Sequence, residues 1–220
     1  MDYNALLNQH LCFAFDRQLL LADLVENLNW GYDVSTGILS FGDRYEFQAE
    51  ILGTEADGDA SWLWSWANEM SSLPPERTQA ALKLKQLGEA EGIPELSEAR
   101  HSLSVLNGHA LGMIAVGQKL GQAYYHGSHD QGAVLLLIVE PQMPWTVENH
   151  LQRITTTFPQ IIGQMEVEDH QNALFHYLQH YGLEPEAMEN VLVVRENGEE
   201  ILHASFDDLN RLQELKTSIH

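Results

Sequence analysis

Three tryptophans at alternate positions form the most conspicuous candidate binding surface. Trp62, Trp64 and Trp66 are each separated by one residue, and Asn68 follows them. In a β-strand successive side chains point to opposite sides, so the three indoles are expected on one face. Each indole can bury up to about 250 Å². Two interpretations remain open: the indoles pack in the core, or Trp62, Trp64, Trp66 and Asn68 line a pocket that binds a ligand.

Histidine supplies the next candidates, with 11 copies. His176 and His180 have the i, i+4 spacing of a metal-binding pair, but helical geometry places both opposite the apolar stripe, and we expect them to project into solvent. A metal site needs three or four ligands, and none is predicted here. His126, His129 and Asp130 lie close together in a segment expected to be a loop. They form either an ordinary polar loop or a site that binds a cation or carries a proton.

The sequence gives little support for a reactive cysteine or for a cofactor-binding site. The single cysteine, Cys12, lies in an apolar stretch, and we expect a buried, inert thiol. One cysteine excludes an internal disulfide and a cysteine-based zinc site. The sequence lacks the motifs of dinucleotide sites, P-loops, zinc proteases and hydrolase nucleophile elbows. The sequence therefore predicts no cofactor and no catalytic residue, and it leaves open whether the protein is an enzyme.

The elements that position these residues begin with one helix and a small sheet. The apolar residues of 2–26 recur at helical spacing. Between about residues 28 and 67, four runs alternate apolar and polar residues, which predicts an antiparallel meander with one apolar face. The fourth run covers Ser61–Ala67. Phe41-Gly42-Asp43-Arg44 suits a two-residue type II′ turn, because glycine stands first.

The middle of the chain predicts helices and a buried strand. A helix is expected to start after Pro74-Pro75 and to end before Pro94. Asn107 is the expected N-cap of a helix to about Tyr125. Each of the glycines inside this helix costs about 1 kcal/mol relative to alanine, which predicts close packing on a neighbour. The apolar run Ala133–Val139 predicts a buried strand.

Two helices and a hairpin are expected in the C-terminal third. Thr146 is the expected cap of a helix to about Phe158, and a second helix starts at Asp169. Asn197-Gly198 between two apolar runs is the strongest hairpin signal in the chain. Leu212–Ile219 predicts a last strand or a short helix.

Together these elements indicate an α+β fold. The meander of about residues 28–67 packs with the N-terminal helix and several later helices, and a hairpin lies at the C-terminus. The length, and the lack of an obvious linker, predict a single domain over residues 1–220.

The segments around the tryptophans resemble a family of uncharacterised bacterial proteins. The similarity consists of an I-L-G strand, here within Gln48–Thr54, followed by W-x-W-x-W-A-N at Trp62–Asn68. A helix followed by Tyr-Tyr at Ala110–Tyr125 and an A-x-F-D pattern at Ala204–Asp207 also fit. The resemblance implies a single soluble, cytoplasmic, bacterial domain. It implies no activity or cofactor and transfers no catalytic residue.

The charge of the chain restricts the classes of partner that we expect it to bind. The sequence has 32 acidic residues against 11 lysines and arginines, a net charge of −21. This charge opposes phosphate backbones and anionic lipids, so we expect no nucleic acid and no membrane as a partner. The N-terminus lacks the pattern of a signal peptide, and a cytoplasmic location is expected. The oligomeric state is left open.

Two functions from different classes follow. The first is a non-enzymatic acidic interaction protein that binds a basic partner, as an immunity-type inhibitor does, because complementary charge speeds association. The second is a small-molecule-binding domain or an enzyme that uses an aromatic pocket around Trp62, Trp64 and Trp66. The absence of catalytic motifs favours the first.

Overall fold

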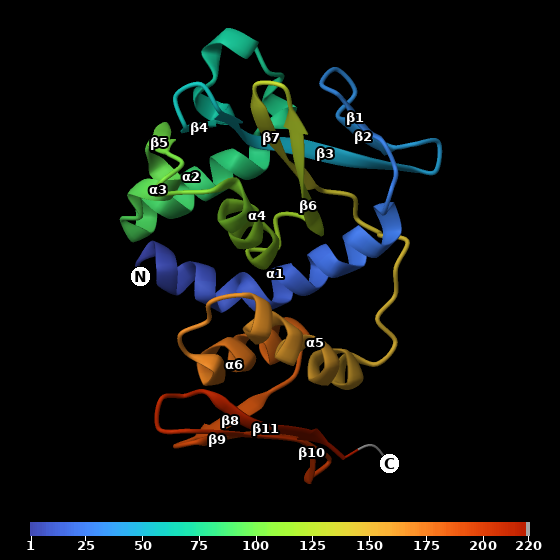
Figure 1. Ribbon diagram of the computed structural model, residues 1–220, viewed down its shortest axis with the longest axis vertical. Coiled ribbons are helices and arrows are strands. Elements are labelled where there is room, and N and C mark those ends of the chain that lie inside the picture. The colour runs from blue at the N-terminus through green and yellow to red at the C-terminus, as the bar shows by residue number, and fades with distance from the viewer. Residues whose placement is uncertain (219–220) are drawn as a thin grey trace.

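The computed structural model describes residues 1–218 and shows an α+β protein with α1 at its centre (Figure 1). Within these residues the α-helices are α1 (Tyr3–Val25), α2 (Gln79–Glu91), α3 (Pro94–Ser97), α4 (Gly108–Gly117), α5 (His150–Gln164) and α6 (His170–His180). The strands are β1 (Trp30–Asp33), β2 (Ile38–Phe41), β3 (Tyr45–Ala56), β4 (Ser61–Trp64), β5 (Arg100–Ser102), β6 (Ala123–His129), β7 (Gly132–Ile138), β8 (Pro185–Met188), β9 (Val191–Glu196), β10 (Glu199–Phe206) and β11 (Leu212–Thr217). The predicted fold class is confirmed.

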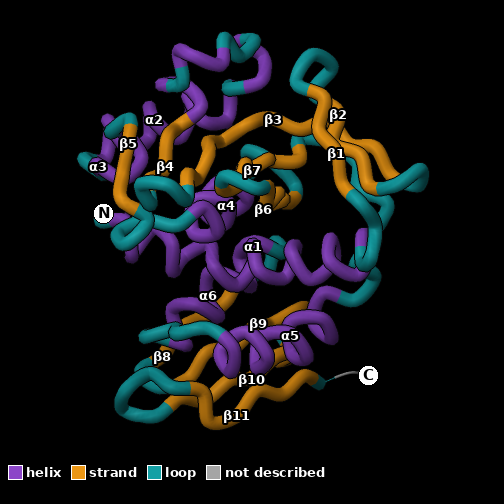
Figure 2. The backbone as a smooth tube through the Cα atoms, turned by 45° about the horizontal axis from the view of Figure 1, so that its top comes forward, coloured by secondary structure: helices purple, strands orange, loops and turns teal. Residues whose placement is uncertain are grey.

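The larger sheet has seven strands within the described residues, and its pairs are antiparallel. Strands β1 to β5 follow one another in chain order, which confirms the predicted meander. β3 also pairs with β7, and among the described strands β6 pairs only with β7. The sheet arches over α1 in Figure 2. Side chains of β7 alternate between two buried clusters, so both faces of the sheet are covered.

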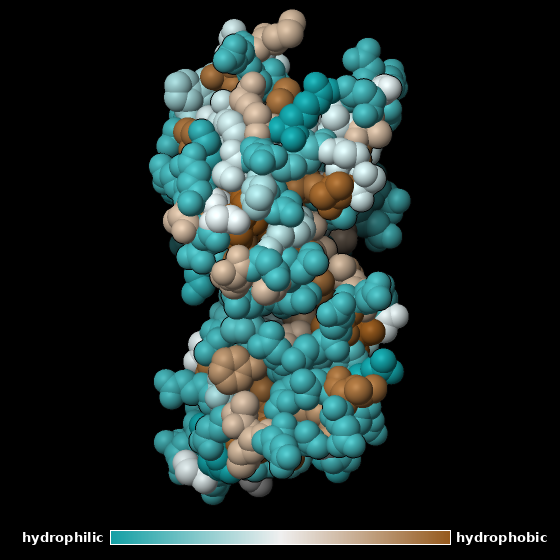
Figure 3. All heavy atoms as spheres, turned by 90° about the vertical axis from the view of Figure 1, so that its left-hand side faces the viewer, coloured by the Kyte–Doolittle hydropathy of each residue, from teal (hydrophilic) through white to brown (hydrophobic). Residues whose placement is uncertain are grey.

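Helix α1 lies between the two halves of the molecule. α4 and the larger sheet pack on one side of it and α5 and α6 on the other, with the C-terminal sheet beyond them (Figure 1). Figure 3 shows that the surface narrows between the two halves. One cluster of buried side chains nevertheless continues from Trp64 in β4 through Leu11 in α1 to Leu202 in β10. A single domain requires such continuity; that residues 1–220 form one domain stays a prediction.

A buried ion pair joins α1 to the C-terminal helices. Asp16 in α1 has no exposed surface, and its carboxylate accepts hydrogen bonds from Nε of Arg153 at 2.6 Å and from the Tyr181 hydroxyl. Arg153 lies in α5 and Tyr181 directly follows α6. A buried carboxylate needs such partners, because its removal from water costs several kcal/mol. The two halves are therefore held together by polar contacts as well as by apolar packing.

Two details of the predicted meander are wrong. β4 ends at Trp64, because its pairing with β3 and β5 does not continue past that residue, and a 3₁₀ turn replaces the second half of the predicted strand over Ser61–Ala67. The β2–β3 hairpin pairs Phe41 with Tyr45, so its loop has three residues rather than two. Gly42 has a φ of 53° in this loop, a conformation that glycine adopts without steric cost.

The predicted helix over Asn107–Tyr125 is wrong beyond its first ten residues. After α4, Lys119 adopts a left-handed φ of 58° and the chain turns back into strand β6. The adjacent tyrosines of this segment favour a strand, and β7 supplies the pairing. The close packing that the glycines predict is confirmed, because a Cβ on Gly112 would lie 2.4 Å from the ring of Tyr124.

The C-terminal third follows the prediction except at the two ends of α5, which runs to Gln164 rather than to about Phe158. Asn149, not Thr146, caps α5, because its side chain accepts the N–H of Gln152 at 3.0 Å. Asp169 caps α6 as predicted. The predicted hairpin is confirmed as β9 and β10, and β8 and β11 extend it to a four-stranded sheet in the order β11-β10-β9-β8. The last predicted element is a strand; Ile219 lies outside the described residues.

Candidate functional site

An open groove of about 700 Å³ lies between α1, α4, β6 and the end of α5, and we call it the α1–β6 groove. Its lining residues are Phe15, Gln18, Leu21, Ala22, Val25, Glu26, His109, Met113, Tyr124, Tyr125, His126, Gln164 and Met165. Apolar side chains predominate among them. A groove of this composition favours a ligand with an apolar surface, oriented by a few polar groups.

Tyr124 connects the three elements that form the groove. It lies in β6, an edge strand that among the described strands pairs only with β7. The side-chain amide of Gln18 in α1 donates a hydrogen bond to the Tyr124 carbonyl at 2.8 Å. On the other side, Gly112 allows α4 to approach the Tyr124 ring. β6 is thus tied to α1 by a hydrogen bond and to α4 by close packing, and these contacts fix the groove walls.

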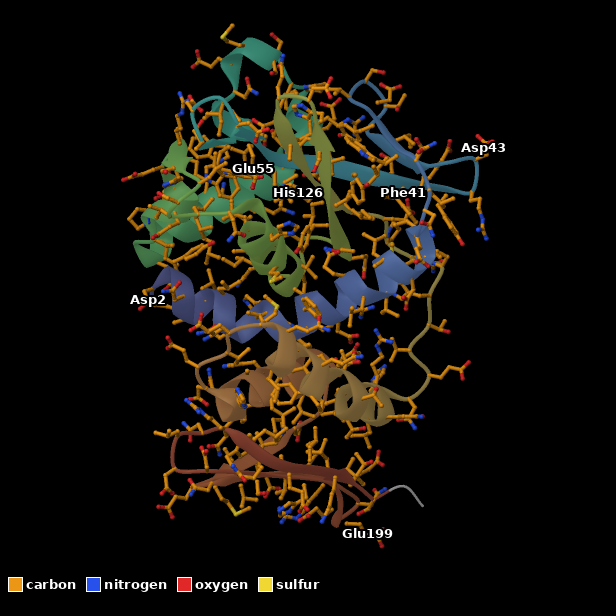
Figure 4. The ribbon with its side chains drawn as sticks, viewed as in Figure 1. Asp2, Phe41, Asp43, Glu55, His126 and Glu199 are labelled. Carbon is orange, nitrogen blue, oxygen red and sulfur yellow. The ribbon has the colours of Figure 1, made fainter. Side chains whose placement is uncertain are left out.

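Four side chains form a polar cluster at the groove: Glu55, His126, His109 and Tyr124. Glu55 in β3 bonds to Nε2 of His126 in β6 at 2.8 Å, and Figure 4 shows the two residues side by side. The other Glu55 oxygen accepts the N–H of Gly108, at the start of α4, at 2.7 Å. The His109 ring stacks on His126 with 4.6 Å between centroids, and its Nδ1 lies 3.2 Å from the Tyr124 hydroxyl.

Burial shifts the pKa values of His109 and Tyr124. It lowers the pKa of His109 and outweighs the Glu55 carboxylate, which raises it, so His109 is neutral at pH 7. Burial also raises the pKa of the Tyr124 hydroxyl, which keeps its proton. No lysine or arginine is among the residues that line the groove within the described part of the chain. The groove therefore offers a ligand no permanent positive charge.

The polar cluster can orient a ligand and exchange a proton with it. The Glu55 carboxylate can accept the Nε2 proton of His126, and in this tautomer Nδ1 is an acceptor. A carboxylate–imidazole pair of this kind serves as the general base of serine hydrolases, but such catalysis also needs a nucleophile. Within residues 1–218, neither His126 nor His109 is hydrogen-bonded to a serine, threonine or cysteine. The geometry supports recognition of a ligand more directly than covalent catalysis.

The tryptophans are not among the residues that line this groove. Trp62 and Trp64 have no exposed surface, and the Trp64 indole donates to the carbonyl of Glu95 at 3.1 Å. Both belong to the core, as the first interpretation states. Trp66 is half-buried beneath Nζ of Lys85, and the Asn68 side chain accepts the N–H of Ser71. A binding role for these residues stays a prediction.

The prediction that His180 projects into solvent is wrong. Its ring stacks on Phe13 of α1 with centroids 4.4 Å apart, and its Nε2 lies 3.1 Å from Nδ1 of His10. The Gln118 amide nitrogen lies 2.9 Å from the other ring nitrogen of His10. Gly117 makes room for that ring, because a Cβ there would lie 2.1 Å from it. α6 is covered by α1 on one side and the C-terminal sheet on the other, so its apolar stripe alone does not define its buried surface.

The other predicted residues do not assemble into one site. The predicted loop around His126 is a strand, and His129 and Asp130 are exposed at its far end. His176 is half-buried. Within residues 1–218, no three His, Cys, Asp or Glu side chains are placed to hold a metal ion. Cys12 is buried, which raises the pKa of its thiol to about 12, as expected for an unreactive cysteine.

Sequence reasoning does not single out Glu55 and His109. The one local signal for His109 is the predicted cap Asn107, which places residue 109 in the first turn of a helix. Glu55 lies beyond the alternating run of residues 45–51, after a register shift between Ile51 and Gly53 that the alternation does not predict. These residues meet His126 only because β7 pairs with β3 on one edge and β6 on the other, a register that no local pattern specifies.

Residues 4–141 match a family of unknown function, DUF6882, and this match covers more than half of the 220 residues. The chain belongs to the DUF6882 family. No curated protein and no solved structure matches it. The DUF6882 region runs from α1 through β7 and supplies every groove residue except Gln164 and Met165.

The family match confirms the expected family of unknown function for the DUF6882 region. The tryptophan motif as a family signature and a bacterial origin stay predictions. No helix within residues 1–218 is both long and apolar enough to cross a membrane.

Proposed function

We propose that the protein is a non-enzymatic binding protein that holds an apolar ligand in the α1–β6 groove. The observation that carries this proposal is the composition of the groove. Leu21, Val25, Met113 and Met165 provide apolar walls, and the polar cluster adds hydrogen-bonding groups at one place. Apolar walls with a few convergent polar groups are typical of ligand sites.

A structural role of Glu55 favours binding over catalysis. One of its oxygens holds the first N–H of α4 and the other orients His126. A carboxylate bonded at both oxygens is suited to positioning the rings of the polar cluster. The Tyr124 hydroxyl and His109 complete a set of fixed donors and acceptors around the groove.

A basic protein partner is the second candidate, supported by the net charge of −21. A field of this sign attracts cationic surfaces and raises their association rates. An immunity-type inhibitor of a basic partner in the cytoplasm of a bacterium would fit this charge.

The groove is tested with N-phenyl-1-naphthylamine, a neutral fluorophore that becomes brighter in apolar sites. Its emission is titrated with wild-type protein and with Ala22→Trp, which places an indole on the groove wall. Ala5→Trp is the matched control, because Ala5 is also exposed on α1 but does not line the groove.

We expect saturable binding to wild type and Ala5→Trp, and affinity at least about tenfold weaker, or about 1.4 kcal/mol, for Ala22→Trp. Absence of binding to the wild-type protein, or equal binding to both variants, would refute the proposed function.

A further inference from the structure

The hydrogen-bonding pattern of the polar cluster determines which ligand groups it accepts. The Tyr124 side chain is buried, so its O–H proton needs an acceptor. Within residues 1–218 the partner of this hydroxyl is Nδ1 of His109, at 3.2 Å. The hydroxyl keeps its proton and therefore donates to Nδ1. In neutral His109 the proton then resides on Nε2, which becomes a donor.

The neighbouring ring has the opposite arrangement. Nε2 of His126 donates to the Glu55 carboxylate at 2.8 Å, and in this Nε2–H tautomer Nδ1 is the acceptor of the ring. Among the described residues, neither Nε2 of His109 nor Nδ1 of His126 has a hydrogen-bond partner. Both rings line the groove and lie 4.6 Å apart between centroids. The groove thus presents one unpaired donor and one unpaired acceptor side by side.

Charge restricts the ligand further. The lining residues include the carboxylate of Glu26 but, in the described part of the chain, no lysine or arginine. Burial keeps the His109 imidazole neutral at pH 7. An anionic head group would enter this groove without a counter-charge, in a protein of net charge −21.

We infer that the α1–β6 groove takes a neutral amphipathic molecule, an apolar chain that ends in a hydroxyl or a primary amide. The head group donates to Nδ1 of His126 and accepts from Nε2 of His109, while the chain lies against Leu21, Val25 and Met113. The two unpaired ring nitrogens are then satisfied without burying a charge. This inference rests on the proposed function, because it specifies the ligand of the same groove.

The test compares three probes with the same chain: 1-decanol, decyl methyl ether and decanoate. The affinity of each probe is measured by its displacement of N-phenyl-1-naphthylamine from the wild-type protein at pH 7.5. The ether lacks the donor and the carboxylate carries a charge, so we expect decanol to bind at least about fivefold more tightly than either, the equivalent of one hydrogen bond.

Three variants assign this preference to His126. His126→Phe keeps an aromatic ring but removes the acceptor, and we expect decanol to lose its advantage over the ether. His126→Gln restores an amide acceptor and should recover part of that advantage. His129→Phe, at an exposed position outside the groove, should leave it unchanged. Tighter binding of decanoate than decanol, or an unchanged decanol preference in His126→Phe, would overturn the inference.

A readout independent of the variants is the nitrogen spectrum of the imidazoles. With decanol bound, the Nε2 resonance of His109 and the Nδ1 resonance of His126 should both shift in wild-type protein, and the ether should leave Nδ1 of His126 unshifted. If the fluorophore binds but decanol and ether behave alike, the inference fails and the proposed function stands. If the fluorophore does not bind, the proposed function itself fails.

Discussion

At the scale of single residues, type and spacing fix what a side chain can do but not where it lies. Trp62, Trp64 and Trp66 alternate, and this pattern suits a buried face and a pocket wall equally well. Burial of the first two could not be decided from the sequence, because it depends on distant elements. The Trp64 indole bonds to Glu95 in α3, and the Trp62 ring lies beside Gly108 in α4. The donor and acceptor roles of His109 and His126 likewise arise from partners distant in the sequence.

Trp64→Ala tests the core assignment. Trp64 has no exposed surface and its indole N–H is paired, so truncation should lower the free energy of unfolding by about 3–5 kcal/mol. Half-buried Trp66 provides the control, and Trp66→Ala should cost less. Urea denaturation measures both. A Trp64→Ala protein within about 1 kcal/mol of wild type would contradict the core assignment.

The His10–His180 pair predicts a pH dependence of stability. Burial lowers the pKa of each histidine to about 4, and for His180 nearby Lys119 adds to the effect. In the unfolded chain both titrate near 6.5. Between these values the unfolded state binds more protons, so stability present above pH 6.5 is lost as the pH falls toward 4.

His180→Gln should flatten this dependence. Thermal unfolding is followed from pH 7 to pH 4.5, and the loss of melting temperature should be smaller in the variant than in wild type. His129→Gln, at an exposed position, should retain the wild-type slope. Identical slopes in all three proteins would argue against the buried neutral pair.

At the scale of elements, the sequence predicted the helices and strands that depend on caps, turns and alternation within a few residues. The cap Asp169, the Asn197-Gly198 turn and the alternation of β3 all indicate the observed elements. The helix expected over Asn107–Tyr125 failed because strand pairing with β7 is a long-range effect that propensity over a few residues does not contain. The groove also depends on this long-range pairing, because β6 forms one of its walls.

Two glycine substitutions test how tightly α4 packs. A Cβ on Gly112 would lie 2.4 Å from the Tyr124 ring, so Gly112→Ala should destabilise the protein by about 1–3 kcal/mol. Gly163, inside α5, has no neighbouring atom within 4 Å of such a Cβ. Gly163→Ala should therefore stabilise the protein by about 0.5–1 kcal/mol, the gain in helix propensity. Chemical denaturation measures both changes in the free energy of unfolding. If Gly112→Ala and Gly163→Ala change it equally, α4 does not need to pack closely against Tyr124.

At the scale of the whole molecule, α1 serves both halves. One side of α1 packs on α4 and forms a wall of the groove. The other side carries Asp16, which binds Arg153 and Tyr181. Arg153 is 137 positions away from Asp16, so this pairing was beyond the reach of sequence patterns. The charge of −21 was readable at once, but charge describes the kind of partner and not the place where it binds.

The central claim is that the α1–β6 groove binds the ligand, and the methionine methyl groups report on it directly. Of the six methionines in the chain, Met113 and Met165 line the groove, whereas Met70 and Met188 are exposed elsewhere. Protein labelled with ¹³C at the methionine methyl groups is titrated with 1-decanol and with N-phenyl-1-naphthylamine. We predict saturable shifts of the Met113 and Met165 resonances, with those of Met70 and Met188 unchanged. Shifts confined to the other methionines, or no shift at saturating probe, would contradict the account.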